Sequence, residues 1–169
     1  MGVEIASNII FLGTGGDSYV VGKQLRASGG IILQIEDDQY HIDPGPGSLI
    51  MAKEAGINLR ANTALFVTHN HINHANDINA VIDAMTYGGF DKKGVLVANN
   101  TVINGSMHYE PFLQKYYRDC LERFIVLGEG KKVGINDVEI KAIKAKHSEP
   151  NAIGFKFITQ DYTLTYTGD

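Results

Sequence analysis

The chain has a single cysteine, Cys120, among its 169 residues. One cysteine excludes an internal disulfide bond and any metal site built from a cysteine cluster. No apolar run reaches the roughly 20 residues that a helix needs to cross a bilayer, and no signal-peptide pattern opens the chain. From these absences we expect a cytoplasmic protein with no membrane contact.

Neither sign of charge is in large excess. The 15 basic residues are outweighed by 19 acidic ones, for a net charge of −4, which gives no electrostatic case for a nucleic-acid surface. A nuclease whose metal ions neutralise the scissile phosphate is still compatible with this charge. The hydrophobic fraction of 44% and the length are ordinary for one globular domain, and we expect residues 1–169 to form one.

Short apolar runs between turn residues predict a fold of many strands, and most of the 19 glycines fall at the turns. A buried strand over Ala64–Val67 leads directly into a histidine-rich loop, and helical spacing of apolar residues predicts a helix that starts near Asn76-Asp77. Residues 99–109 are expected to be irregular, and Pro111 to open another helix. The pattern indicates a single α/β unit. The other expected elements are strands over Asn8–Leu12, Gly30–Glu36, Gln39–Ile42, Val95–Ala98, Phe124–Leu127, Val138–Ala145, Ile153–Ile158 and Tyr162–Thr167, a turn at Asp37-Asp38 and a helix over Ser48–Ala55.

The most informative segment is Thr68–His74, which holds three of the six histidines. Imidazole is the commonest protein metal ligand because the neutral ring offers a lone pair at physiological pH. In extended backbone His69 and His71 project to the same side, and His74 can return from the following turn. Converging rings would repel one another if protonated, and a bound cation removes that cost. The segment therefore predicts a metal site, against the plainer interpretation of a histidine-rich surface loop.

Five segments, in order along the chain, resemble the metallo-β-lactamase fold superfamily. Thr68–His74 resembles its HxHxDH signature, and Phe11–Gly16 resembles the LGTG turn of transfer-RNA 3′-processing endonucleases and related phosphodiesterases. His41–Gly47 resembles the first motif, Lys146–Ser148 the third and Tyr166–Asp169 the fourth. The resemblance spans nearly the whole chain and is closer to the phosphodiesterase branch than to the true β-lactamases.

This resemblance implies an α/β fold of the αββα sandwich type, of which the chain would supply the N-terminal half and the start of the second sheet. It also implies that His69, His71 and His147 hold a first metal ion, that His74 belongs to a second, and that Asp169 bridges the two. Zinc is the expected ion, as one or two ions, with manganese or iron as alternatives. A metal-bound hydroxide would then be the nucleophile. The implied function is a metal-dependent hydrolase acting on phosphodiester-type or other small-molecule substrates.

Asn73 departs from the family pattern, because the motif has aspartate at that position. We place Asn73 at the catalytic position, but an amide is neutral and does not act as a base at ordinary pH. The second metal site should therefore be weakened, and hydrolysis impaired. Asn73 could instead cap the following helix, and Asp77, one helical turn further on, could supply part of the missing charge.

The chain ends on Asp169, where the superfamily continues into further strands, a helix and another metal-binding histidine. We expect a domain truncated at its C-terminus, whose open sheet edge is covered by an oligomer contact or a partner chain. The alternative function is a catalytically silent metal-binding protein, or a subunit that needs a partner to complete the fold. RNA is a further candidate substrate that the charge does not support.

Several features have a structural interpretation beside the functional one. A lone inward-facing histidine such as His147 is more often a hydrogen-bonded core residue than a ligand, and the upstream histidine loop favours the ligand. Asp43 is either a turn aspartate or the partner that orients a ligand imidazole. We expect His41 to be structural and His108 to be exposed. Gly13–Gly16 lacks the lysine and serine/threonine pattern of a phosphate-binding loop, so we expect a tight turn there.

Overall fold

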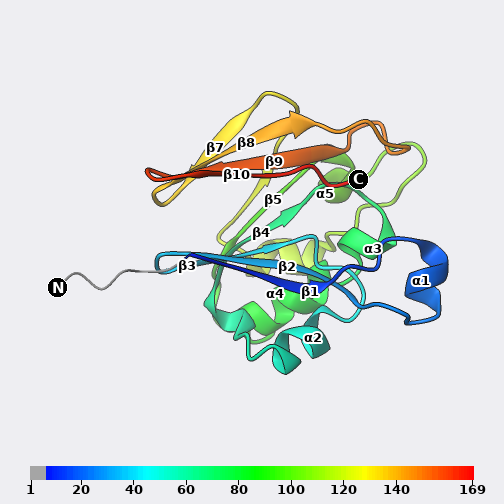
Figure 1. Cartoon of the computed structure of the whole chain (residues 1–169), viewed down its shortest axis with the longest axis horizontal. Helices are drawn as coiled ribbons and strands as arrows, with labels where there is room; N and C mark the ends of the chain where they lie inside the picture. The colour runs from blue at the N-terminus through cyan, green and yellow to red at the C-terminus, as the bar shows by residue number, and fades with distance from the viewer. Residues whose placement is uncertain (1–6) are drawn as a thin grey trace.

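The computed structural model describes residues 7–169, which form two β-sheets and a set of short helices (Figure 1). The expected absence of a signal peptide concerns in part the N-terminal residues 1–6, which lie outside the described residues. Within residues 7–169, no helix has both the length and the apolar character needed to span a membrane.

The first sheet has six strands in the order β1-β2-β3-β4-β5-β6. Its first three strands form an antiparallel meander, whereas β3, β4, β5 and β6 run parallel to one another. The carboxyl ends of the parallel strands therefore meet at one edge of the sheet, which is where ligands commonly bind in such sheets. The strands are β1 (Asn8–Gly13), β2 (Ser28–Ile35), β3 (Asp38–Ile42), β4 (Asn62–Val67), β5 (Val95–Ala98) and β6 (Arg123–Val126).

The second sheet is antiparallel, in the order β10-β9-β8-β7, and it covers one face of the first sheet (Figure 1). Aromatic rings fill the space between the sheets: Phe66 of the first sheet lies 5.3 Å from Phe155 and 5.0 Å from Phe157, measured between ring centroids. All three rings are fully buried. The strands are β7 (Lys132–Ile135), β8 (Val138–Lys144), β9 (Ile153–Ile158) and β10 (Thr163–Tyr166).

Helices cover the opposite face of the first sheet, and α4 shows why they do so. Its residues Ile78, Val81, Ile82 and Met85 recur at helical spacing and are fully buried against that face. Figure 1 shows no helix on the outer face of the second sheet within residues 7–169, so the layer order is helices, first sheet, second sheet. The helices are α1 (Ser18–Gly22), α2 (Ser48–Glu54), α3 (Ile72–Ala75), α4 (Ile78–Thr86), α5 (Asn100–Asn104) and α6 (Lys115–Cys120), with a 3₁₀ turn over Leu59–Ala61.

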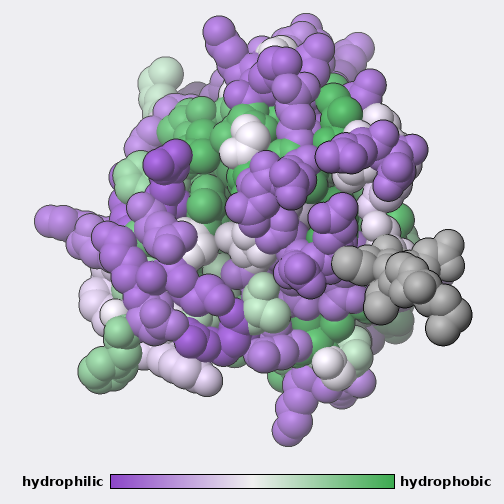
Figure 2. Space-filling view, turned by 90° about the vertical axis from the view of Figure 1, so that its left-hand side faces the viewer, coloured by the Kyte–Doolittle hydropathy of each residue, from purple (hydrophilic) through white to green (hydrophobic). Residues whose placement is uncertain are grey.

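The outer surface at one end of the sandwich is mostly polar. Figure 2 looks at the end of the molecule that lies away from α1, α3 and the C-terminus, and hydrophilic residues cover most of it, with apolar residues visible in its upper half. The loops that carry the histidines lie at the other end (Figure 1).

The strands expected from the sequence are confirmed to within about two residues at most ends, and α4 begins directly after Asp77. Three expectations are wrong. The turn between β2 and β3 is formed by Glu36 and Asp37, one residue earlier than expected. The segment expected to be irregular contains α5, whose N-terminus is capped by the Asn99 side chain. The helix expected to open at Pro111 begins only at Lys115, as α6. Before it, Phe112 donates its N–H to the Val102 carbonyl and is not part of a helix.

The core between the sheets should dominate the stability of the fold. Replacing the fully buried Phe66 by alanine removes a ring from the aromatic cluster, and we expect the free energy of unfolding to fall by about 3–5 kcal/mol. The matched control is Phe90→Ala, because Phe90 is 97% exposed and should change it by less than about 0.5 kcal/mol. Urea unfolding followed by circular dichroism measures both. Equal effects of the two variants would contradict this description of the core.

Candidate metal centre

The candidate site lies where the parallel strands of the first sheet end. Asp43 directly follows β3, Thr68 directly follows β4, and Asn99 directly follows β5. From Thr68 the chain turns through His69 and Asn70 into the short helix α3. The loop after β8 brings His147 to the same edge from the second sheet.

The carboxylate of Asp43 organises this edge. It is buried and lies at a left-handed φ of 50°, a conformation that aspartate tolerates better than most residues. Its Oδ1 accepts the Thr68 backbone N–H at 2.8 Å. Its Oδ2 accepts three further hydrogen bonds, from the Thr68 hydroxyl at 2.8 Å, the Tyr166 hydroxyl at 2.9 Å and His74 Nδ1 at 2.8 Å. Of the two interpretations left open by the sequence, the structure shows the second: Asp43 orients an imidazole of the histidine loop.

These hydrogen bonds fix the protons on two of the histidines. Thr68 has one hydroxyl proton, and it goes to Asp43. The 2.9 Å contact between Thr68 Oγ1 and His69 Nδ1 therefore has His69 as the donor. Likewise, His74 Nδ1 donates to Asp43. In the neutral form of either ring, Nε2 then carries a free lone pair, which is the state that a metal ligand requires.

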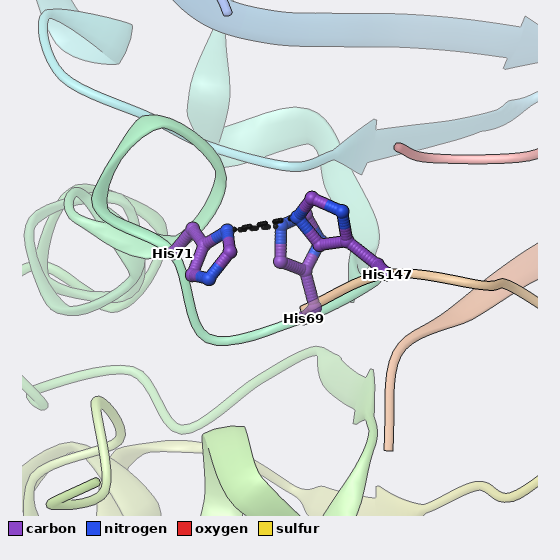
Figure 3. A group of neighbouring side chains, drawn as sticks. All are labelled: His69, His71 and His147. Atoms are coloured by element: carbon purple, nitrogen blue, oxygen red, sulfur yellow. Dashed lines mark hydrogen bonds between the residues drawn. The ribbon is translucent and has the colours of Figure 1, made fainter. Parts of the chain in front are cut away.

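Three imidazole nitrogens converge beside this network (Figure 3). His69 Nε2 lies 3.0 Å from His71 Nδ1, and His147 Nε2 lies 3.0 Å from the same atom. Nitrogens that share one tetrahedral zinc ion at about 2.0–2.1 Å lie about 3.3 Å apart, so the spacing is close to that of a ligand set. A single proton on His71 Nδ1 could be donated to only one of its two neighbours, His69 Nε2 or His147 Nε2. A bound cation would accept the lone pairs of all three nitrogens.

The electrostatics of the site keep the rings of His69 and His71 neutral. Burial, reinforced by the charge that His74 would carry, lowers the pKa of His69 to about 3. Burial and the neighbouring His147 also lower the pKa of His71. His74 differs: burial alone would lower its pKa, but the hydrogen bond and charge of Asp43, together with Asp169, raise it. His69 and His71 are therefore free of competing protons at neutral pH.

A second group of donors adjoins the first. His69, His74 and Asp169 lie within ligand distance of one another. Asp169 Oδ1 is 3.2 Å from His74 Nε2, and its Oδ2 is 3.7 Å from His147 Nε2. The carboxylate thus lies between the two groups of histidines. His74 Nε2 is buried, and Asp169 Oδ1 is the polar atom beside it.

The donors present fit a metal ion at the first group. Three neutral nitrogens with a carboxylate at their side form a set that zinc accepts. The second group is poorer, because it offers His74 and Asp169 in addition to a histidine that the first group already uses. The structure brings together all five residues expected to bind metal, and their ligation stays a prediction.

Asn73 and Asp77 have hydrogen-bond partners other than those that the sequence suggests. Asn73 is inside α3, and its amide nitrogen donates to the Gly16 carbonyl at 2.9 Å, so it ties the histidine loop to the glycine-rich segment and does not cap the next helix. The idea that Asp77 supplies charge to the second group is wrong. Its Oδ2 accepts the N–H groups of Gly47 and Ser48, both at 2.9 Å, and so caps α2.

The close packing of the site explains one glycine. A Cβ atom on Gly45 would overlap the carbonyl oxygen of Asn73, so the loop after Asp43 can lie directly against α3 only with glycine there. The tight turn expected at Gly13–Gly16 is wrong: residues 14–16 form no turn, and Gly15 donates its N–H to the Ala27 carbonyl, beside the paired strands β1 and β2. His41 is structural, as expected: it is fully buried, and its Nε2 lies 2.7 Å from the Gly29 carbonyl.

Glu149 is a site-supporting residue that the sequence analysis missed. It is 1% exposed, and its carboxylate accepts hydrogen bonds from Asn99 Nδ2 at 2.6 Å, Thr101 Oγ1 at 3.0 Å and the Asn151 N–H at 2.8 Å. These bonds fasten the loop that carries His147 to the start of α5. The only sequence signal was an acidic residue two positions after the histidine, which by itself is typical of a surface loop.

A cleft of about 930 Å³ opens in front of His71 and His147, two of the three histidines of the first group. His71, His147 and Asp169 lie at its floor, and residues from 16–22 and from 108–112 line its two sides. His108 is exposed, as expected, and is among the lining residues. The volume suits a small-molecule ligand.

No protein-family model matches the chain. Among curated proteins, it is 35% identical over 161 residues to the uncharacterized protein MJ1374 of Methanocaldococcus jannaschii, and the match covers 95% of this chain and 60% of that protein. The chain therefore spans about 60% of the length of this relative.

Solved structures with low sequence identity share the architecture. The metallo-beta-lactamase fold protein YhfI of Bacillus subtilis matches with a TM-score of 0.72 and 16% identity, over 96% of this chain and 62% of that one. Human tRNase Z, short form, matches with a TM-score of 0.68 and 15% identity, over 97% and 69% of the two chains. A diphosphatase of the PhnP family gives a TM-score of 0.62 and 20% identity, over 89% and 61%.

Removing the charge of Asp43 should weaken metal binding without removing a ligand. In Asp43→Asn, an amide N–H₂ group must face the donors that now converge on the carboxylate. We expect zinc affinity, measured by competition with a chromophoric chelator, to fall about 10–100-fold. The control is Asp161→Asn, because Asp161 is exposed in a turn. Unchanged affinity in Asp43→Asn would show that this carboxylate does not support a metal site.

Asp77 should contribute to stability and not to metal binding. In Asp77→Ala, the N–H groups of Gly47 and Ser48 lose their acceptor, and we expect the free energy of unfolding to fall by about 1 kcal/mol. Asp77→Asn keeps one acceptor oxygen and should retain most of that stability. Zinc stoichiometry should be the same in both variants. A loss of bound zinc in Asp77→Ala would contradict this prediction and show that Asp77 supports metal binding.

Proposed function

We propose that this chain, which has the metallo-β-lactamase fold, is a zinc-dependent hydrolase acting on phosphodiester-type substrates. The observation that carries the proposal is the convergence of His69 Nε2, His71 Nδ1 and His147 Nε2, with His71 and His147 lining a cleft. Two of the structural neighbours are by name a tRNase and a diphosphatase, and they match with higher TM-scores, 0.68 and 0.62, than the neighbours that are by name metallo-beta-lactamases, at 0.57 to 0.60. This difference supports phosphate esters over lactams as substrates.

In this proposal the three nitrogens would hold the ion, with Asp169, which lies 3.2 Å from His74 Nε2 and 3.7 Å from His147 Nε2, as the neighbouring carboxylate. A bound divalent cation supplies Lewis acidity, which stabilises charge on a phosphoryl oxygen and acidifies water. The residues of the chain do the remaining work. Asp43 keeps His74 oriented, and Thr68 keeps the Nδ1 proton on His69. Asp169, which is partly exposed beside the nitrogens, is the carboxylate placed to accept the proton of an attacking water.

One observation favours a second function, that of a metal-binding protein without hydrolytic activity. Asn73 stands where the related motif has aspartate, and its amide is already engaged by the Gly16 carbonyl. An amide neither accepts a proton at neutral pH nor contributes charge to a second metal ion. In this alternative the first site binds zinc tightly, and the second stays weak.

The remaining expectations from the sequence stay proposals. These are the single domain over residues 1–169, the cytoplasmic location, and a partner chain or second copy along β10. In the part of the chain that the structure describes, β10 is an edge strand of the second sheet, and edge strands are commonly covered or paired.

Metal stoichiometry tests the proposed function. We expect elemental analysis to give one tightly bound zinc ion per wild-type chain and none in His147→Ala, because that variant removes one of the three nitrogens. In Asn73→Asp the donation to Gly16 is lost, which should cost about 1 kcal/mol of stability and free a carboxylate for a second ion. Hydrolysis of bis(4-nitrophenyl) phosphate should be slow in the wild type and at least about tenfold faster in Asn73→Asp.

The outcomes separate the two functions. Zinc in the wild type with no hydrolysis by the wild type or by Asn73→Asp would favour the silent metal-binding protein. Absence of zinc from the wild type and from Asn73→Asp alike would reject both functions. The control is His108→Ala, which removes an exposed imidazole and should leave zinc stoichiometry unchanged.

A further inference from the structure

The cleft in front of His71 and His147 has one apolar side. Tyr109, Pro111 and Phe112 are partly buried and line it, and Ile72, which is 63% exposed, adds to the same lining from α3. A single exposed apolar residue needs no explanation, but several in one concave surface indicate a ligand-binding surface. Aromatic rings at such positions present flat faces on which another ring can stack.

This apolar side is held in place before any ligand binds. Phe112 donates its N–H to the Val102 carbonyl at 3.0 Å, and its own carbonyl accepts Asn79 Nδ2 at 2.8 Å. Asn70, in the histidine loop, donates to the Glu110 carbonyl at 3.2 Å. The side is thus tied to α4, to α5 and to the metal-binding loop. A ligand that contacts it therefore avoids most of the cost of ordering the protein.

The charge of the residues that line the cleft disfavours binding of a polyanion. Among the described residues that line it, Asp17, Glu110 and Asp169 are acidic, and none is lysine or arginine. Proteins that bind nucleic-acid strands neutralise successive phosphates with basic side chains along a groove. A bound divalent ion could neutralise one scissile phosphodiester, but the acidic lining would repel further phosphates.

From these observations, and resting on the proposed hydrolase function, we propose that the cleft selects small phosphodiesters that carry a single negative charge and an aromatic or branched apolar group. The charged phosphoryl group lies at the floor, beside His71 and His147. The apolar group lies against Phe112 and Ile72. A nucleic-acid strand is excluded by the acidic lining and by the absence of lysine and arginine from the lining residues.

Binding of analogues that resist hydrolysis tests this specificity separately from catalysis. The probes are methylphenylphosphinate and dimethylphosphinate, which carry the same single charge and differ in one aromatic ring. NMR titration of the zinc-loaded chain should give a dissociation constant at least about tenfold lower for the phenyl compound, as expected for a ring transferred from water to an apolar surface. An oligouridylate of about twelve nucleotides should bind no more tightly than the dinucleotide UpU at either about 50 or about 200 mM salt.

Variants locate the preference. Phe112→Ala and Ile72→Ala should each reduce the preference for the phenyl compound at least about threefold, while zinc stoichiometry and dimethylphosphinate affinity stay unchanged. Loss of the partly buried Phe112 side chain could impair folding. Ile72→Ala then still tests the proposal, because Ile72 is 63% exposed and its loss should not affect folding. The control is Phe124→Ala: Phe124 is 40% exposed on β6 and is not among the residues lining the cleft.

Three results would overturn the proposal. They are equal affinity for the two phosphinates, binding that strengthens with oligonucleotide length and weakens steeply with salt, and no binding of either phosphinate to the zinc-loaded chain. None of them bears on whether the chain is a zinc hydrolase, which zinc stoichiometry and bis(4-nitrophenyl) phosphate hydrolysis decide on their own.

Discussion

The buried carboxylate of Asp43 is the group on which the arrangement of the site depends. It accepts hydrogen bonds from Thr68 at the end of β4, from His74 in α3, and from Tyr166 at the end of β10. One side chain therefore joins the two sheets to the histidine loop. Four donors on one carboxylate use most of its acceptor capacity, so the geometry leaves little freedom for any of the partners.

The packing of the two sheets beneath the site determines how close the histidines from different sheets lie. The aromatic cluster around Phe66 sets the spacing of the two sheets, and this spacing decides whether His147, on a loop of the second sheet, reaches His71 on a loop of the first. The buried hydrogen bonds of Glu149 then fix that loop against α5. The three nitrogens thus lie close together because of both the apolar core and the polar network above it.

The sequence predicted the structure well wherever a residue pattern is typical of one kind of element or site. Short apolar runs between turn residues located β5 and β9 to the residue, and the histidine spacing identified the candidate site. It was uninformative where a polar side chain has several candidate partners. Asp77 and Asn73 both lie near helix starts, where a side chain commonly caps its own helix, yet their partners are 29 residues or more away. These partners are Ser48 and Gly47 for Asp77, and Gly16 for Asn73. Glu149 was missed for the same reason, since its burial depends on packing between distant strands.

The central claim is that three imidazoles, from His69, His71 and His147, bind one metal ion. X-ray absorption spectroscopy at the zinc edge of the purified, zinc-loaded chain tests it most directly. Our account predicts a four-coordinate ion with three imidazole nitrogens at about 2.0–2.1 Å and the remaining position taken by oxygen. A spectrum with fewer than three imidazole nitrogens, or no stoichiometric zinc to measure, would contradict it.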